Sequence, residues 1–339
     1  MKTIIGKPID ISILKGTARS DFLKQNQISK KVAQKFLKSS DKKKIKRCII
    51  CNSKKIKLVS KVLNIEFMQC SNCLHVFNKY RYSEKFLKSF WKRDGDIIAV
   101  HTHGKQQSYR TKNLSEPKIK QVLDLINKDP KRINWLDMGC GNGEFLISAK
   151  KMGVRVYGFD LNERDIKLAK KKGIKAFQTN LQGFYENCYD NKTKFDVISS
   201  TGYFDMIDYP IKEMQILEKM TKTGTIFMLD VPDFDSITHE MIKTFPEKSI
   251  RHLNACQRSS FTSKSAFYLL RKFNYKPMLR WHYGLDFYMI LNFLKQQTHK
   301  FENTKVFKIM TKRYSDFQKI FDQEKSSDTI FIIAKKNKR

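Results

Sequence analysis

The chain has 339 residues, of which 40% are hydrophobic and 12% aromatic, enough to fill the core of one large domain or two smaller ones. The first residues, MKTIIGKPIDISILKG, lack the apolar run and cleavage site of a signal peptide. No later segment reaches the roughly 18 uninterrupted apolar residues of a membrane span. We therefore expect a soluble, cytoplasmic protein with no membrane partner. Seven cysteines without an export signal also argue against a disulfide framework.

The formal net charge of +34 indicates affinity for an anionic partner such as a nucleic acid. Arg supplies only 14 of the 67 basic residues, however, and base reading and bidentate phosphate recognition favour Arg. A Lys excess spread along the whole chain is also what an AT-rich genome produces without selection for binding. The charge therefore leaves open both a generic compositional effect and a surface for a polyanion.

Residues 1–47 form a basic arm. Its apolar residues follow a loose helical period, with members at Phe22, Leu23, Ile28, Val32, Phe36 and Leu37. This pattern favours a solvated amphipathic helix that packs on the body of the protein over an RNA-binding tail.

Four cysteines follow the pattern C-x2-C-x18-C-x2-C, at Cys48, Cys51, Cys70 and Cys73. Two close pairs at this interval are typical of a structural zinc site, and an iron–sulfur centre is the alternative for four thiolates. Because the protein would fill all four positions, the Zn²⁺ ion would stabilise the module rather than activate water. We expect a zinc ribbon over residues 48–80.

Three histidines lie near this ribbon. His75 follows the last of the four cysteines, and we interpret it as a surface residue or as a support of the metal ligands. His101 and His103, in the sequence HTHG, fit two solvated or substrate-facing imidazoles better than a second metal site. They lie in residues 81–116, for which we expect a helical linker that contributes to the cover of the active site.

From Pro117 onward, short apolar segments alternate with helical segments. The predicted strands lie at 133–139, 154–160, 174–180, 195–202, 225–233, 276–284 and 328–336. Strands alternating with helices indicate a mostly parallel α/β sheet covered on both faces. Ligands of such sheets bind beyond the carboxyl ends of the strands.

The sequence NWLDMGCGNGEF places an acid and three glycines after the first of these strands, at Asp137, Gly139, Gly141 and Gly143. A nicotinamide-binding turn would need a glycine where this chain has Glu144. The arrangement D-x-G-x-G-x-G resembles motif I of class I S-adenosylmethionine (SAM) dependent methyltransferases. That resemblance implies that the turn binds the methionine part of SAM, and that Asp160, which closes the second strand, binds the ribose hydroxyls. An ordinary helix cap is the alternative role for Asp160.

The resemblance extends over the rest of this region. It implies cofactor contacts from Leu161 and, after the third strand, adenine contacts from Asn180 and Leu181. The segment FDVISSTGYFDMIDYP resembles a stretch of the family that reads V-L-E-H-I-x-D-P, which aligns Asp205 with the Glu and Met206 with the His. The fold implied is a Rossmann-like α/β domain over residues 117–339. It has seven strands, an N-terminal zinc ribbon, and a helical insertion at about 285–327 before the last strand.

A zinc ribbon joined to such a core resembles methyltransferases of nucleotide-sugar, polysaccharide and natural-product pathways. The segment RHLNACQRSSFTSKSAFYLL is similar to theirs and contains His252, which we expect to be the general base. Tyr203 and Asp205 are weaker candidates for binding or deprotonating the acceptor. We expect the acceptor to be a small, anionic metabolite such as a nucleotide-linked sugar. A zinc-ribbon methyltransferase of rRNA guanine, a protein methyltransferase and a SAM-binding protein without catalysis remain alternatives.

Overall fold

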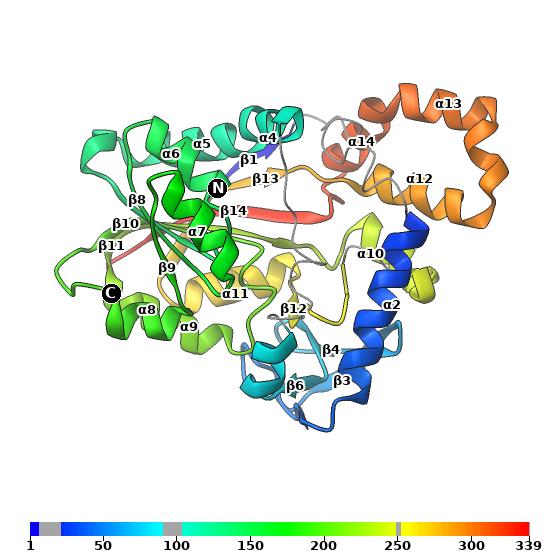
Figure 1. Cartoon of the computed structure of the whole chain (residues 1–339), viewed down its shortest axis with the longest axis horizontal. Coiled ribbons are helices and arrows are strands. Elements are labelled where there is room, and N and C mark those ends of the chain that lie inside the picture. The colour runs from blue at the N-terminus through cyan, green and yellow to red at the C-terminus, as the bar shows by residue number, and fades with distance from the viewer. Residues whose placement is uncertain (7–21, 91–103, 249–251, 339) are drawn as a thin grey trace.

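The computed structural model describes residues 1–6, 22–90, 104–248 and 252–338. Its central sheet has eight strands in the spatial order β1 (Lys2–Ile5), β13 (Tyr275–His282), β14 (Thr329–Lys336), β11 (Thr221–Pro232), β10 (Phe195–Thr201), β7 (Asn134–Met138), β8 (Arg155–Asp160) and β9 (Lys175–Gln178) (Figure 1). Only β14 runs antiparallel to its neighbours. The strand order reverses between β7 and β10, which makes the carboxyl ends of these strands the expected place for a ligand.

Helices cover both faces of the sheet (Figure 1). One face carries α5 (Glu116–Ile126), α6 (Glu144–Lys151) and α7 (Glu163–Lys171), and the other carries α8 (Leu181–Asn187), α9 (Pro210–Met220) and α11 (Ser263–Lys272). Strand side chains alternate between these two layers. In β7, Trp135 packs in the core formed with α5, α6 and α7, while Leu136 packs with α8, α9 and α11. Burial on both faces explains why the strands appear in the sequence as short apolar runs.

All seven predicted strands are present, but the predicted strand number is wrong, because the sheet has an eighth member. Residues Lys2–Ile5, assigned from the sequence to the basic arm, form β1 and pair in parallel with β13 at the edge of the sheet. Gly6 allows this approach, since a Cβ there would lie 2.4 Å from Nε1 of Trp281. A strand of four residues is too short to show a period in the sequence.

The predicted amphipathic helix of the arm is present as α2 (Phe22–Lys38). It buries Val32, Ala33 and Phe36. The ring of Phe36 makes edge-to-face contacts with Tyr82 and Phe86, at centroid distances of 4.8 and 5.2 Å. The described part of the arm is therefore packed on the protein through aromatic contacts.

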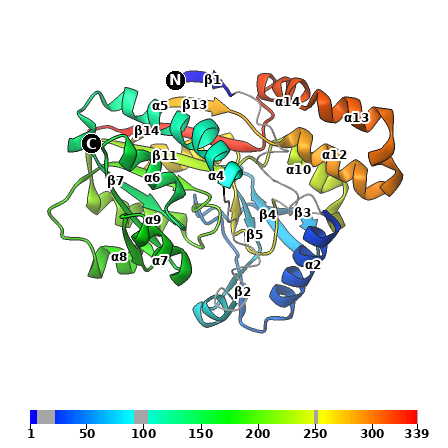
Figure 2. The same cartoon turned by 45° about the horizontal axis from the view of Figure 1, so that its top comes forward.

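A second sheet has four strands in the order β12 (Ser259–Ser260), β5 (Val76–Asn78), β4 (Ile65–Cys70) and β3 (Ile56–Val62) (Figure 2). Beside it, β2 (Lys42–Lys44) pairs with β6 (Tyr80–Tyr82). We call residues 48–80 the four-cysteine module. Its sheet includes β12, which comes from a distant part of the sequence, so main-chain hydrogen bonds join the module to the segment that follows β11.

The remaining long helices are α4 (Gly104–Arg110), α10 (Ile237–Thr244), α12 (Asp286–Gln297), α13 (Lys305–Lys312) and α14 (Tyr314–Gln323). The last three lie in the region where the sequence predicts an insertion. None of the helices in the described ranges combines the length and apolar character needed to cross a bilayer. The domain boundaries drawn from the sequence stay predictions, and residues 91–103 of the proposed linker lie outside the described ranges.

Candidate active site and metal centre

The glycine turn follows β7 directly and leads into α6. Gly139, Gly141 and Gly143 all have positive φ angles, of 66°, 51° and 76°. A Cβ at Gly143 would lie 3.2 Å from the Cβ atom of Ala169, so this glycine lets the turn lie close to α7. A Cβ at Gly141 would meet no atom within 4 Å. Gly141 therefore borders open space and is the position at which a ligand can approach the backbone.

Asp160 at the end of β8 is hydrogen-bonded to this turn. Its Oδ2 atom accepts from the backbone N–H of Gly141 at 3.0 Å, and its Oδ1 atom from that of Asn162 at 2.8 Å. An ionised carboxylate can accept about four hydrogen bonds, so capacity remains for two hydroxyl groups. The cap of α7 is Asn162, whose side chain accepts from the N–H of Asp165, so the helix-cap interpretation of Asp160 is wrong. Burial raises the pKa of Asp160.

Asp137 at the end of β7 lies inside the core, with 3% of its surface exposed. Ser199 donates a 2.5 Å hydrogen bond to its Oδ1 atom, and the indole N–H of Trp135 donates to Ser199 at 2.8 Å. Burial raises the pKa of Asp137 to about 7. The network fixes this carboxyl group directly before the glycine turn. Ser199 was missed in the sequence, because nothing there shows that β10 lies beside β7.

The three other predicted cofactor residues have different surroundings. The side chain of Leu161 is 58% exposed next to Asp160. The Oδ1 atom of Asn180 accepts from the N–H of Gly183 at 2.8 Å and so caps α8. Leu181 is completely buried in the core, so its side chain is unavailable to a ligand in this structure. The cofactor contact of Leu161 and the adenine contacts of Asn180 and Leu181 stay predictions.

Tyr203 and Asp205 follow β10, and Tyr203 lies beside the glycine turn. A Cβ at Gly139 would lie 3.0 Å from Cδ2 of Tyr203, whose hydroxyl donates to Oε2 of Glu213 at 3.0 Å. Burial and the nearby Glu213 carboxylate raise the pKa of Tyr203 well above its usual value. A tyrosine held in this way is a poor base near neutral pH.

Asp205 is buried, with 5% of its surface exposed. Its Oδ2 atom accepts from the side-chain amide of Gln257 at 3.1 Å, while its Oδ1 atom has no hydrogen-bond partner among the described residues. Burial raises its pKa to about 6. One carboxylate oxygen is thus held by the protein, while the other is buried without a hydrogen-bond partner among the described residues.

His252 comes after β11 and is 7% exposed. Its Nε2 atom lies 3.5 Å from Oδ2 of Asp328, immediately before β14. Its ring stacks on that of His239 in α10, with centroids 5.2 Å apart. Because β14 is antiparallel to β11, Asp328 lies at the carboxyl edge of the sheet, and the structure places His252 at that edge. Its role as a base stays a prediction.

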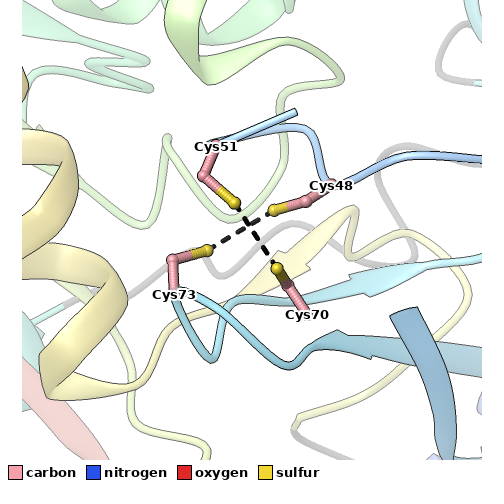
Figure 3. Close-up of side chains that lie close together, drawn as sticks. All are labelled: Cys48, Cys51, Cys70 and Cys73. Atoms are coloured by element: carbon pink, nitrogen blue, oxygen red, sulfur yellow. Dashed lines mark hydrogen bonds between the residues drawn. The ribbon is translucent and has the colours of Figure 1, made fainter. Parts of the chain in front are cut away.

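The four cysteines of the module come together as one cluster, with their four sulfur atoms within 4.8 Å of one another (Figure 3). The Sγ atoms of Cys48 and Cys73 are 3.5 Å apart, and those of Cys51 and Cys70 are 3.4 Å apart. A tetrahedral ion with Zn–S bonds of about 2.3 Å requires sulfur separations of about 3.8 Å. The two measured separations are close to this value, and the four sulfur atoms are near enough to one another to surround such an ion.

His75 is not a surface residue, which corrects one of the two interpretations from the sequence. It has no exposed surface. Its ring lies edge-on to Phe261 at 4.6 Å, and its Nε2 atom is 3.2 Å from Oγ of Ser259. Burial lowers its pKa to about 3. His101 and His103 lie outside the described residues.

No sequence pattern predicts the ion pairs between Asp208 and two buried arginines. Oδ1 of Asp208 lies 3.1 Å from Nε of Arg81 and 3.3 Å from Nε of Arg258. The guanidinium of Arg258 also stacks over the rings of Phe36 and Tyr82. These residues come from four separate parts of the chain, and no sequence spacing relates them.

A parallel sheet with this strand reversal, an antiparallel strand next to the fifth strand, and a glycine turn bound to an acid on the neighbouring strand define a class I methyltransferase domain. Residues 107–279, just over half of the chain, match the methyltransferase domain family, and the chain belongs to it. The predicted SAM-dependent methyltransferase class is confirmed.

Individual relatives are distant. Over 156 residues the chain is 30% identical to the ubiquinone biosynthesis O-methyltransferase of Pelagibacter ubique, covering 43% of this chain and 62% of that protein. It is 23% identical over 169 residues to the protein of the same name from Colwellia psychrerythraea, covering 48% and 64%. The chain thus spans less than two thirds of the length of these relatives.

Among solved structures, the chain is similar to the magnesium protoporphyrin IX methyltransferase of Synechocystis with bound SAH. The sequence identity is 10% and the TM-score 0.46, and the match covers 75% of this chain and 100% of the other.

Proposed function

We propose that the chain transfers a methyl group from SAM to a small-molecule acceptor at the carboxyl edge of the main sheet. The observation that carries the proposal is the glycine turn, whose Gly141 borders open space while its N–H holds the carboxylate of Asp160. SAM supplies an electrophilic methyl group on a positively charged sulfur. The residues of the chain have to bind it, align the acceptor and accept the proton that the acceptor loses.

Asp160 is suited to bind the ribose of SAM. The Gly141 and Asn162 N–H groups fix the orientation of its carboxylate before any ligand arrives. A preorganised carboxylate forms charge-assisted hydrogen bonds with two hydroxyl groups without a further loss of side-chain freedom. Asp160 therefore contributes affinity and also sets the position of the cofactor relative to the turn.

Asp205 is the base that the surroundings of the three candidates favour. It comes two residues after Tyr203, which packs on Gly139 of the turn, and one of its buried carboxylate oxygens has no hydrogen-bond partner among the described residues. Its pKa of about 6 leaves it ionised at neutral pH, yet nearer to the operating pH than that of an ordinary aspartate. His252 is the second candidate, supported by its place at the same edge of the sheet.

We propose that the acceptor is a nucleotide-linked sugar or a related biosynthetic intermediate. Support comes from the combination of a four-cysteine module with the methyltransferase core, and from the FTSKS segment that follows β12. A sugar diphosphate is anionic, so part of the net charge of +34 would favour its binding. The names of the two curated relatives also point to a small acceptor.

The acceptor class can be tested with purified protein and methyl-labelled SAM. The label is offered in parallel to a metabolite extract, a set of nucleotide sugars and total RNA, and the products are analysed by mass spectrometry. We expect labelled small metabolites. Label found in RNA alone, with binding that falls steeply with salt, would show an RNA methyltransferase instead.

We also propose one structural Zn²⁺ ion on Cys48, Cys51, Cys70 and Cys73. The sulfur separations of 3.4 and 3.5 Å are close to those of a tetrahedral zinc site. All four ligand positions would be filled by thiolates, which leaves none for a water molecule. The ion would therefore stabilise the module and take no part in methyl transfer.

A further inference from the structure

The four-cysteine module shares a strand with the segment that follows β11. Ser259 pairs with Phe77 and Ser260 with Val76, both antiparallel. The N–H of Asn78 also donates to the carbonyl of Arg258 at 3.0 Å. The position of β12 is therefore set by the sheet of the module and not by the main sheet alone.

His75 connects the cysteine cluster to this strand. Its carbonyl accepts from the N–H of Cys70 at 2.9 Å, and its ring lies 3.2 Å from the hydroxyl of Ser259. The ring also packs against Phe261. His75 has no exposed surface, its carbonyl is bonded to a cysteine and its ring contacts β12, so the residue has little freedom to move.

The segment that contains β12 is also hydrogen-bonded to Asp205, the proposed base. The N–H groups of Arg258 and Ser259 donate to the carbonyl of Asp205 at 2.8 and 3.0 Å. The adjacent Gln257 donates to the carboxylate of Asp205 at 3.1 Å. Both the main chain and the side chain of Asp205 are thus anchored to the segment that contains β12.

The second candidate base is connected to β12 as well. Oγ of Ser260 lies 3.3 Å from Nε2 of His239, and the His239 ring stacks on His252. A shift of β12 would therefore change the positions of both Asp205 and His252, the two residues proposed to act on the acceptor.

The SAM side of the site has a separate set of hydrogen bonds. The backbone N–H of Cys140 donates to the carbonyl of Phe159 at 3.0 Å, and that of Gly141 donates to the carboxylate of Asp160 at 3.0 Å. These bonds join the turn to β8 and involve no residue of the module. The two sides of the site meet where Tyr203 packs on Gly139.

We infer that His75 is a positioning residue, through which the four-cysteine module fixes β12 and thereby the acceptor side of the active site. The inference rests on the proposed function. It assigns the module a part in turnover, since a displaced Asp205 no longer reaches the proton of the acceptor. It assigns the module no part in SAM binding.

The test uses the full chain with His75→Phe, which keeps a ring of similar size and removes the contact with Ser259. Ser259→Ala removes the same contact from the other side with a smaller change. Ser71→Ala, at an exposed serine of the same module, is the control. Each protein is measured for zinc content, SAM affinity, turnover, and amide hydrogen exchange at residues 257–260.

We expect both variants to keep their zinc and to bind SAM within twofold of the wild type. Exchange at residues 257–260 should become at least tenfold faster and turnover should fall about tenfold, with no change for Ser71→Ala. Unchanged exchange in both variants, or an equal loss of SAM affinity and turnover, would overturn the inference. A wild-type protein without turnover would instead refute the proposed function, and exchange would still decide whether His75 holds β12.

Discussion

The carboxylate of Asp160 and the backbone N–H of Gly141 are joined by a 3.0 Å hydrogen bond between the ends of two neighbouring strands. The bond orients the acid and restrains the turn at the same time. The proposed ribose ligand and the part of the backbone nearest to the cofactor are therefore one preformed unit, and a change in either should affect SAM binding.

Replacing Asp160 with Ala should weaken SAM binding by about 2 kcal/mol, roughly thirtyfold, because two ribose hydroxyls lose a charged acceptor. Isothermal titration calorimetry measures this directly. Asp124→Ala, at an exposed position on α5, is the control and should bind SAM like the wild type. An affinity of Asp160→Ala within twofold of the wild type would refute the ribose assignment.

Gly141→Ala should weaken SAM binding strongly while it lowers the stability of the fold only slightly. The added methyl group meets no protein atom, so the free energy of unfolding should fall by only about 1–2 kcal/mol, the cost of a positive φ angle. SAM affinity should fall tenfold or more, because the methyl group occupies the space of the ligand. Gly143→Ala is the matched comparison. Its methyl group would press on Ala169, so denaturant unfolding should show the larger loss of stability.

Freshly purified protein should contain close to one zinc per chain, measured by elemental analysis. Cys70→Ser should lose the metal and become sensitive to protease within residues 48–80, because metal binding and folding of such a module are coupled. Cys188→Ser, which lies outside the cluster, should keep both the zinc and the resistance. A metal-free wild type that resists protease would contradict the zinc assignment.

Asp205→Asn should lower the methylation rate on the order of a hundredfold at unchanged SAM affinity, because the amide cannot accept the proton. In the wild type, the base acts in its ionised form, which is present above its pKa. The rate should therefore fall tenfold per pH unit below about pH 6 and be constant above it. His252→Gln is measured in parallel. A full hundredfold loss there, with little change in Asp205→Asn, would transfer the role to His252.

Asp208→Asn should destabilise the protein by about 3–5 kcal/mol, because it leaves the guanidinium groups of Arg81 and Arg258 buried without a counter-ion. Chemical denaturation gives this value. Asp316→Asn removes an exposed ion pair with Arg313 and should change the free energy of unfolding by less than about 1 kcal/mol. If the two variants lose similar amounts of unfolding free energy, the ion pairs of Asp208 contribute little to stability.

The parts of the site that follow a strand directly could be predicted from the sequence. Asp137, the glycines and Asp160 lie at fixed distances along the chain from apolar segments, and the strand pattern carries them to one edge of the sheet. The four cysteines are predictable for a similar reason, since each pair forms one short turn. In both cases, local spacing alone specifies which side chains meet.

The contacts around β12 could not be predicted in this way. A two-residue strand has no period, and its partner β5 lies far away in the sequence. The burial of His75 follows from that pairing, and no sequence pattern indicates it. The same holds for Asp208 and its two arginines, because tertiary packing brings them together and no motif contains them.

The pairing of β1 with β13 has a consequence for the order of folding. Lys2 lies opposite Leu279, so this edge of the sheet closes only after most of the chain has been synthesised. Contacts between such distant residues carry a large loop-closure cost and form late. During synthesis the β1 segment remains without its partner while β7, β8 and β10 can already assemble. We therefore expect β1 to join the edge of the sheet last, after the rest of the sheet has formed without it.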